Sequence, residues 1–203
     1  MNNPASIVMN APIIETAAFT QNAVQETVQT SPASSSFTVD GTTYTSAQTF
    51  SWQPGSSHTI ATTSPQNGVT GTRYVWSKWS DTGAISHSVA PTKNTTYTAT
   101  FTTQYYLTMS AGTGGKVSPS TGWKNSGAAL SISATATAGY TFSNWSGTGA
   151  GAYFGTNNPS SITMSGPITE TAMFSRNPSP TPTPTPTPTA TPSDTPTPTR
   201  VPH

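Results

Sequence analysis

The sequence predicts an all-β protein made of tandem small β-sandwich or β-grasp-like repeat modules, followed by an extended polyproline-II tail. Three observations predict this fold class. Apolar and polar residues alternate with a period of two in several short runs, which is typical of half-buried strands. Threonine is frequent in these runs, and its branched Cβ fits a pleated sheet better than a helix. Stretches of the chain also repeat one another, and a long Pro-Thr alternation follows the last repeat.

The first segment, residues 1–22, reads as a copy of residues 157–177. Five apolar residues of the first copy, Ile7, Met9, Ile13, Ala17 and Phe19, recur in the second as Ile162, Met164, Ile168, Ala172 and Phe174. The second copy closes a longer repeat. We therefore interpret residues 1–22 as the terminal strands of an incomplete repeat, with strands near 7–9 and 13–19. A self-similar array of this kind indicates structural or adhesive work rather than catalysis.

Unpaired strands with alternating apolar residues tend to pair with other strands, so these terminal strands are expected to pair with the edge of a sheet. They either pack on the module that follows or add to an open edge of another copy. A head-to-tail contact between copies does not close and would generate a filament. The candidate strand-donor interface consists of Ile7, Met9, Ile13, Ala17 and Phe19.

The middle module is predicted to span residues 23–104. Tyr97, Ala99 and Phe101 alternate with threonines, and Asp40-Gly41 between two strand-like runs predicts a tight hairpin. The aromatic stretch 73–80 is expected to supply much of the core, because each aromatic side chain buries about 150–250 Å². The segment 66–71 has no counterpart in the later module.

The last module is predicted to span residues 105–177. Its residues 139–146 repeat the aromatic stretch of the middle module, and residues 130–136 alternate as a half-buried strand does. Each module is close to the lower size limit for an independent core, so stacking of one module on the other is expected to add stability.

The tail, residues 178–203, alternates proline and threonine. Proline fixes φ and cannot donate to a strand ladder, so the tail is expected to be an extended rod. At about 3.1 Å per residue, such a rod would span on the order of 80 Å. Alternatively, the tail is a disordered linker whose one role is to tether what it joins. The tail also offers threonine hydroxyls. These hydroxyls are candidate O-glycosylation sites, at Thr181, Thr183, Thr185, Thr187, Thr189, Thr195, Thr197 and Thr199.

Composition excludes several classes of function. Only 6% of residues are charged, with seven basic against six acidic side chains, so no basic stripe exists for nucleic acid. The chain has no cysteine, which removes disulfides and thiolate metal sites. No apolar run approaches the roughly 20 residues that span a bilayer, so we expect no membrane insertion.

Catalytic chemistry has few candidate residues. Asp40 lies in the predicted hairpin turn and His58 aligns with Leu130 of the later module, so both are expected to be structural. Asp81 and His87 share a loop region and, with a nearby serine as nucleophile, would be the candidates for a hydrolase site. No catalytic or nucleotide-binding motif occurs, and carboxylates are too few for calcium. We expect no catalytic, cofactor-binding or metal-binding residues.

Four aromatic residues are candidate ligand-stacking platforms. Tyr153 and Phe154 lie in a glycine-rich segment, and Trp52 and Trp123 lie beside turns. Rings in such places either stack on sugar faces or cover the open end of a sandwich and the seam between modules.

The last module carries three distinctive stretches, at residues 114–119, 139–147 and 157–174. On these stretches it strongly resembles the divergent internalin-B-type B-repeat family of bacterial surface and secreted proteins, and the likeness extends to residues 1–22. The middle module is also similar to PEGA surface modules, on residues 37–41 and 55–60.

These resemblances imply an extracellular, β-rich module used in tandem as a spacer, adhesin stalk or interaction surface, with no catalytic residue set. We therefore predict a non-enzymatic structural or adhesive protein at the cell surface, a stalk or self-assembling fibre subunit. Its expected partners are further copies of itself, other cell-surface proteins or glycans. The alternative is a carbohydrate- or protein-binding accessory module, which the Pro-Thr linker tethers to a secreted enzyme.

Overall fold

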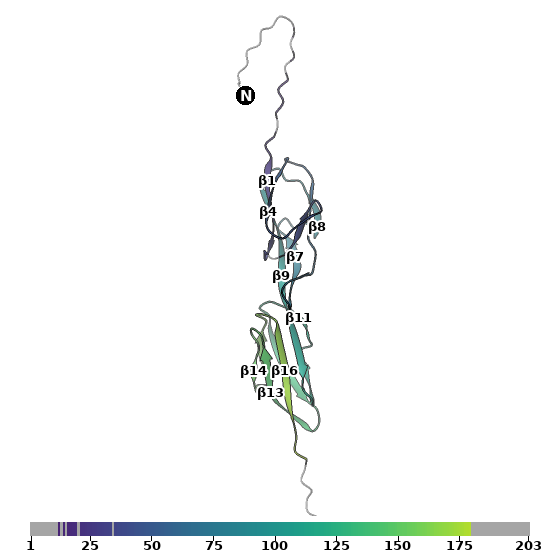
Figure 1. Ribbon diagram of the computed structural model, residues 1–203, viewed down its shortest axis with the longest axis vertical. Helices are drawn as coiled ribbons and strands as arrows, with labels where there is room; N and C mark the ends of the chain where they lie inside the picture. The colour runs from purple at the N-terminus through teal and green to yellow at the C-terminus, as the bar shows by residue number, and fades with distance from the viewer. Residues whose placement is uncertain (1–11, 13, 15, 20, 34, 180–203) are drawn as a thin grey trace, which may run out of the picture.

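The computed structural model describes residues 12, 14, 16–19, 21–33 and 35–179 (Figure 1). These residues form strands, turns and loops with no helix, which confirms the all-β prediction. Accordingly, the described part contains no helix long and apolar enough to cross a membrane. The predicted rod and the glycosylation sites of the tail lie outside the described residues, as do Ile7, Met9 and Ile13.

One nine-stranded sheet runs through both modules. Its strand order is β14-β13-β16-β9-β1-β4, with β11 and β7 also paired to β9, and β6 paired to β7. Its strands are β1 (Val24–Ser31), β4 (Gln48–Trp52), β6 (Gln66–Asn67), β7 (Thr72–Trp79), β9 (Thr95–Ala111), β11 (Gly122–Asn125), β13 (Tyr140–Thr148), β14 (Phe154–Gly155) and β16 (Ile168–Arg176).

Two smaller sheets complete the modules, and each packs on one half of the long sheet. The first has the order β3-β2-β5-β8 and the second β10-β12-β15. Their strands are β2 (Phe37–Val39), β3 (Thr42–Tyr44), β5 (His58–Ala61), β8 (Ser86–Val89), β10 (Gly115–Ser118), β12 (Ala129–Ala136) and β15 (Ser160–Thr163). The result is two small β-sandwiches, as predicted.

Strand β9 belongs to both modules. Its first half pairs with β1 and β7, and its second half pairs with β16 and β11. At Gln104 and Tyr105 it is paired with β7 on one edge and with β11 on the other. The predicted module boundary therefore falls inside a continuous strand, and Figure 1 shows the two modules stacked end to end along it.

Each module has its own core between its two sheets. The first core contains Trp79, Val28 and Ile60, and the second contains Trp145, Leu107 and Ile132, each fully buried. Alternation explains this burial, because residues two apart on a strand face the same side. On β9, for example, Tyr97, Ala99 and Phe101 face the first core and Leu107 and Met109 the second.

A β-bulge brings two aromatic residues of each module to the same face. Trp76 and Trp79 are three positions apart, so a regular strand would place them on opposite faces. The register of β7 shifts between Trp76 and Lys78, and that of β13 shifts between Phe142 and Asn144. The extra residue turns Trp79 and its counterpart Trp145 into the cores. The two modules therefore share this β-bulge as well as the aromatic sequence pattern.

The predicted hairpin at Asp40-Gly41 is present between β2 and β3. Val39 and Thr42 face each other across it, and both turn residues have positive φ, 48° for Asp40 and 82° for Gly41. This is the two-residue turn whose twist matches the flanking strands.

Candidate functional site

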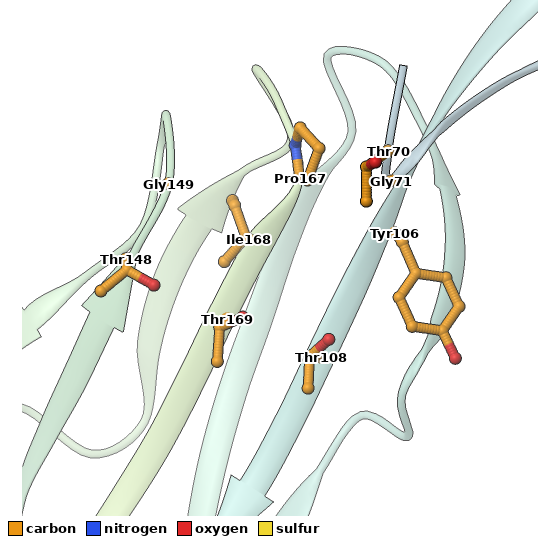
Figure 2. A pocket seen from close by; sticks show the side chains of 9 residues that line it. All are labelled: Thr70, Gly71, Tyr106, Thr108, Thr148, Gly149, Pro167, Ile168 and Thr169. Atoms are coloured by element: carbon orange, nitrogen blue, oxygen red, sulfur yellow. The ribbon is translucent and has the colours of Figure 1, made fainter. Parts of the chain in front are cut away.

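The junction between the modules holds a hollow. It has a volume of about 260 Å³ and is lined from both modules, by Thr70 and Gly71 before β7 and by residues of β9, β13 and β16 with their loops. Figure 2 shows Pro167 next to Thr70 and Gly71 at the top of the hollow. The contact is close, because a Cβ on Gly71 would come 2.8 Å from the Pro167 side chain.

An aromatic and polar cluster, the junction cluster, lies on the same sheet beside the hollow. The guanidinium of Arg73 sits 4.6 Å from the ring centre of Trp123, whose ring meets that of Tyr106 edge to face at 5.1 Å. Arg73 Nε donates to Gln104 Oε1 at 2.8 Å, and Gln104 Nε2 donates to Asn125 Oδ1 at 2.8 Å. The cluster therefore links β7, β9 and β11 across the module boundary.

A second polar network has the order of a serine–histidine–aspartate triad. Asp40 Oδ2 lies 2.7 Å from His58 Nδ1, and His58 Nε2 lies 2.9 Å from Ser56 Oγ. Because a carboxylate oxygen only accepts, Nδ1 carries the proton and Nε2 is free to accept from the hydroxyl. The His58 hydrogen bond, helped by the N–H of Thr59, lowers the pKa of Asp40.

The surroundings of this network favour a structural role. Ser56 Oγ also lies 2.6 Å from the carbonyl of Gln53, which competes for its single proton. The N–H groups of Gly55 and Ser56 donate to carbonyls of Pro91 and Gln53, so neither is available to stabilise an oxyanion. The network instead ties the β2–β3 turn to the β4–β5 turn.

His87 and Asp81, the candidate pair of the hydrolase hypothesis, lie in contact. His87 Nε2 lies 2.8 Å from Asp81 Oδ2, and His87 Nδ1 lies 2.7 Å from the carbonyl of Ala84. Both partners only accept, and between them they occupy both ring nitrogens of His87. With neither nitrogen left to take a proton from a serine, this arrangement does not provide the general base of the hydrolase hypothesis.

Two buried carboxylates occupy the parallel strand pairs. Glu26 on β1 and Glu170 on β16 are both 0% exposed. Glu170 Oε1 accepts from the N–H of Tyr153 at 2.6 Å, whereas its Oε2 and both oxygens of Glu26 form no hydrogen bond with the described residues. Burial raises the pKa of both, opposed in part by the nearby N–H and hydroxyl of Thr95 for Glu26 and by the Tyr153 N–H for Glu170.

The four predicted stacking aromatics differ in their surroundings. Trp52 is 6% exposed, and its ring stacks on those of His58 at 3.9 Å and Phe50 at 5.5 Å, so no face is free for a ligand. Tyr153 packs against the second core and its hydroxyl accepts from Asn157. Phe154 is 76% exposed on the edge strand β14, and Trp123 belongs to the junction cluster.

The described part of the strand-donor segment is exposed and has no strand partner within the described chain. Ala17 lies at the surface, and Phe19 is 94% exposed. Their repeat equivalents show what such residues do inside a module. On β15, β16 and the loop between them, the equivalents of Ile7, Met9, Ile13 and Ala17 are core residues, namely Ile162, Met164, Ile168 and Ala172.

Sequence reasoning missed the hollow and the Ser56–His58–Asp40 network. The hollow had a visible signal, because residues 66–71, the segment without a counterpart in the later module, include the part that reaches Pro167. The network had none, since its residues come from two separate turns. No group of three or more His, Cys, Asp or Glu that could hold a metal ion occurs within the described residues.

The fold and its repeated cores define a tandem β-sandwich repeat protein. Residues 105–178 match the family model of the divergent InlB B-repeat domain, a bacterial surface repeat, so the second module is similar to this family. The resemblance inferred from the sequence is therefore confirmed for that module, whereas the PEGA likeness of the middle module stays a prediction. Comparisons with curated proteins and with solved structures found no match.

Proposed function

We propose that this chain is a non-enzymatic, extracellular spacer, a stalk or fibre subunit built from tandem β-modules that share strands. The observation that carries the proposal is β9, whose 17 residues end one module and begin the next. A shared strand replaces the flexible linker that normally separates domains, so the modules keep a fixed direction. The surface-repeat family of the second module supports a place at the cell surface.

The first segment supports extension of the same array. In the second module, β16 pairs in parallel with β9, and antiparallel with β13. Residues 13–21 are the repeat equivalents of β16, the last strand of the second module. They are followed by β1, the first strand of the first module. In the same way, the first half of β9 ends the first module and its second half begins the second module. Added to a module of a second copy, residues 13–21 would bury the residues whose equivalents are core, and the contact would repeat head to tail.

Sedimentation and electron microscopy of the full chain test strand addition. We expect oligomers or fibres that disappear on deletion of residues 1–22 and weaken on Phe19→Asp. Val69→Asp is the matched control, because Val69 is also an exposed apolar residue, at 78%. A full chain that stays monomeric at high concentration, or fibres that survive the deletion, would rule strand addition out.

The second candidate is the accessory binding module, which the Pro-Thr segment would tether to a secreted enzyme. The uncharged hollow at the module junction favours it, and its ligand chemistry is argued next.

A further inference from the structure

The junction hollow is uncharged and rich in hydroxyl groups. Four of its nine lining residues are threonines, and none of the nine carries a charge. The nearest guanidinium of the junction cluster, that of Arg73, is held over Trp123 and bonded to Gln104. A phosphate or carboxylate ligand would need free cationic partners, so the lining favours a neutral ligand.

Three of the threonines form a row across adjacent strands. Thr148 of β13 is paired with Thr169 of β16, and Thr169 is paired with Thr108 of β9. Their chain neighbours Leu107 and Glu170 are buried in the core, so alternation points the three threonines to the open face of the sheet. Because adjacent strands lie about 4.7–4.9 Å apart, neighbouring strands present these hydroxyls, each a donor and an acceptor, along one side of the hollow.

Tyr106 adds an aromatic surface beside this row. It is two residues before Thr108 on β9 and therefore lies on the same face, as Figure 2 shows. Its ring is held by the edge-to-face contact with Trp123, yet the residue remains 36% exposed. A held but accessible ring costs little conformational entropy when a flat ligand stacks on it.

We infer that the junction hollow is a binding site for a neutral sugar unit of a polysaccharide. A pyranose has an apolar face of C–H groups, which suits the ring of Tyr106, and a rim of uncharged hydroxyls, which suits the threonine row. The hollow is formed by both modules, so neither module alone carries the complete site. This inference is independent of the spacer proposal.

Titration calorimetry of the full chain with cellohexaose, xylohexaose, mannohexaose and hexagalacturonate tests the site. We expect at least one of the three neutral sugars to bind, and the anionic sugar to bind less well. Tyr106→Ala should weaken binding about tenfold, the loss of one stacking contact.

Thr169→Val is the second variant, because it removes one hydroxyl from the row while keeping the shape and a strand-forming residue. It should weaken binding several-fold. Thr49→Val is the matched control, since Thr49 is an exposed threonine of β4 in the first module. Binding by none of the neutral sugars, a preference for hexagalacturonate, or equal binding by parent, Tyr106→Ala and Thr169→Val would each overturn the inference.

Discussion

Glu26 and Glu170 lie where the first and last strands of each module run side by side. Glu26 faces Thr95 in the β1–β9 pair, and Glu170 faces Met109 in the β9–β16 pair. Both carboxyls are removed from water with few hydrogen bonds, so their charged forms are disfavoured. Burial, together with the charge of Glu26, also raises the pKa of Tyr97. The stability of the parallel strand pair in each module therefore depends on whether its buried glutamate is ionised.

Glu26→Gln and Glu170→Gln should each flatten the fall of stability with rising pH. Between the ordinary carboxyl pKa of 4.5 and the raised folded value, the folded chain binds more protons than the unfolded chain. Stability is therefore full below that window and falls as pH rises through it, by at most about 1.4 kcal/mol per pH unit for each group. Urea unfolding from pH 4 to 8 measures the slope, and an unchanged slope in both variants would contradict the assignment.

Asp40→Asn should change the pH dependence of stability on the acid side, where the contribution of Asp40 is lost as pH falls. The lowered pKa of Asp40 means that its contribution is present above the ordinary value of 3.8 and is lost as pH falls through the folded value. Asparagine tolerates the positive φ of this turn, so the substitution removes mainly the charge. The variant should lose up to about 1 kcal/mol at pH 7 and much less at pH 2.5, since the Asp40 side chain is half exposed. Equal losses at both pH values would show that charge is not the cause.

The strands themselves were largely predictable, because alternation and turn residues act locally. The alternation at Leu130 and Ile132 predicted β12, and Asp40-Gly41 predicted the β2–β3 hairpin. The parallel pairing of the first and last strand of each module was not predicted, since its register is fixed by packing between residues far apart in sequence. The sequence left open whether Trp52 packs or binds a ligand for the same reason: His58, which stacks on it, lies on another strand.

The loop between β13 and β14 depends on glycine for two separate reasons. Gly149 and Gly151 both have positive φ, and a Cβ on Gly151 would lie 1.8 Å from the carbonyl oxygen of Thr163. Gly139 has a similar φ of 83°, but a Cβ there would meet no other atom within 4 Å, so this position isolates the conformational cost.

Gly151→Ala should therefore destabilise the protein more than Gly139→Ala. The left-handed conformation costs about 1–2 kcal/mol in either variant. At Gly151 the clash with backbone should add about 1–3 kcal/mol, because the carbonyl of Thr163 cannot rotate away as a side chain can. Chemical denaturation of the two variants gives the difference directly. Equal losses would mean that the loop yields freely.

The two modules share one continuous sheet, and this distinguishes the molecule from two domains joined by a flexible linker. Pairing of β7 and β11 on opposite edges of β9 overlaps at Gln104 and Tyr105, and the junction cluster spans the same place. If one module lost its core, the half of β9 that belongs to the other module would lose strand partners. Each module is small enough to need such help.

Unfolding of the intact chain should accordingly be a single cooperative transition, with equal calorimetric and van't Hoff enthalpies. Insertion of two glycines between Gln104 and Tyr105 should interrupt β9 and the junction cluster, split the transition in two and shorten the maximum dimension in small-angle scattering. The same insertion after Thr92, an exposed residue in the loop before β9, leaves the shared strand intact and is the matched control. Two transitions in the parent chain, or one in all three chains, would contradict coupling through β9, because the shared strand is the feature that the first insertion alone removes.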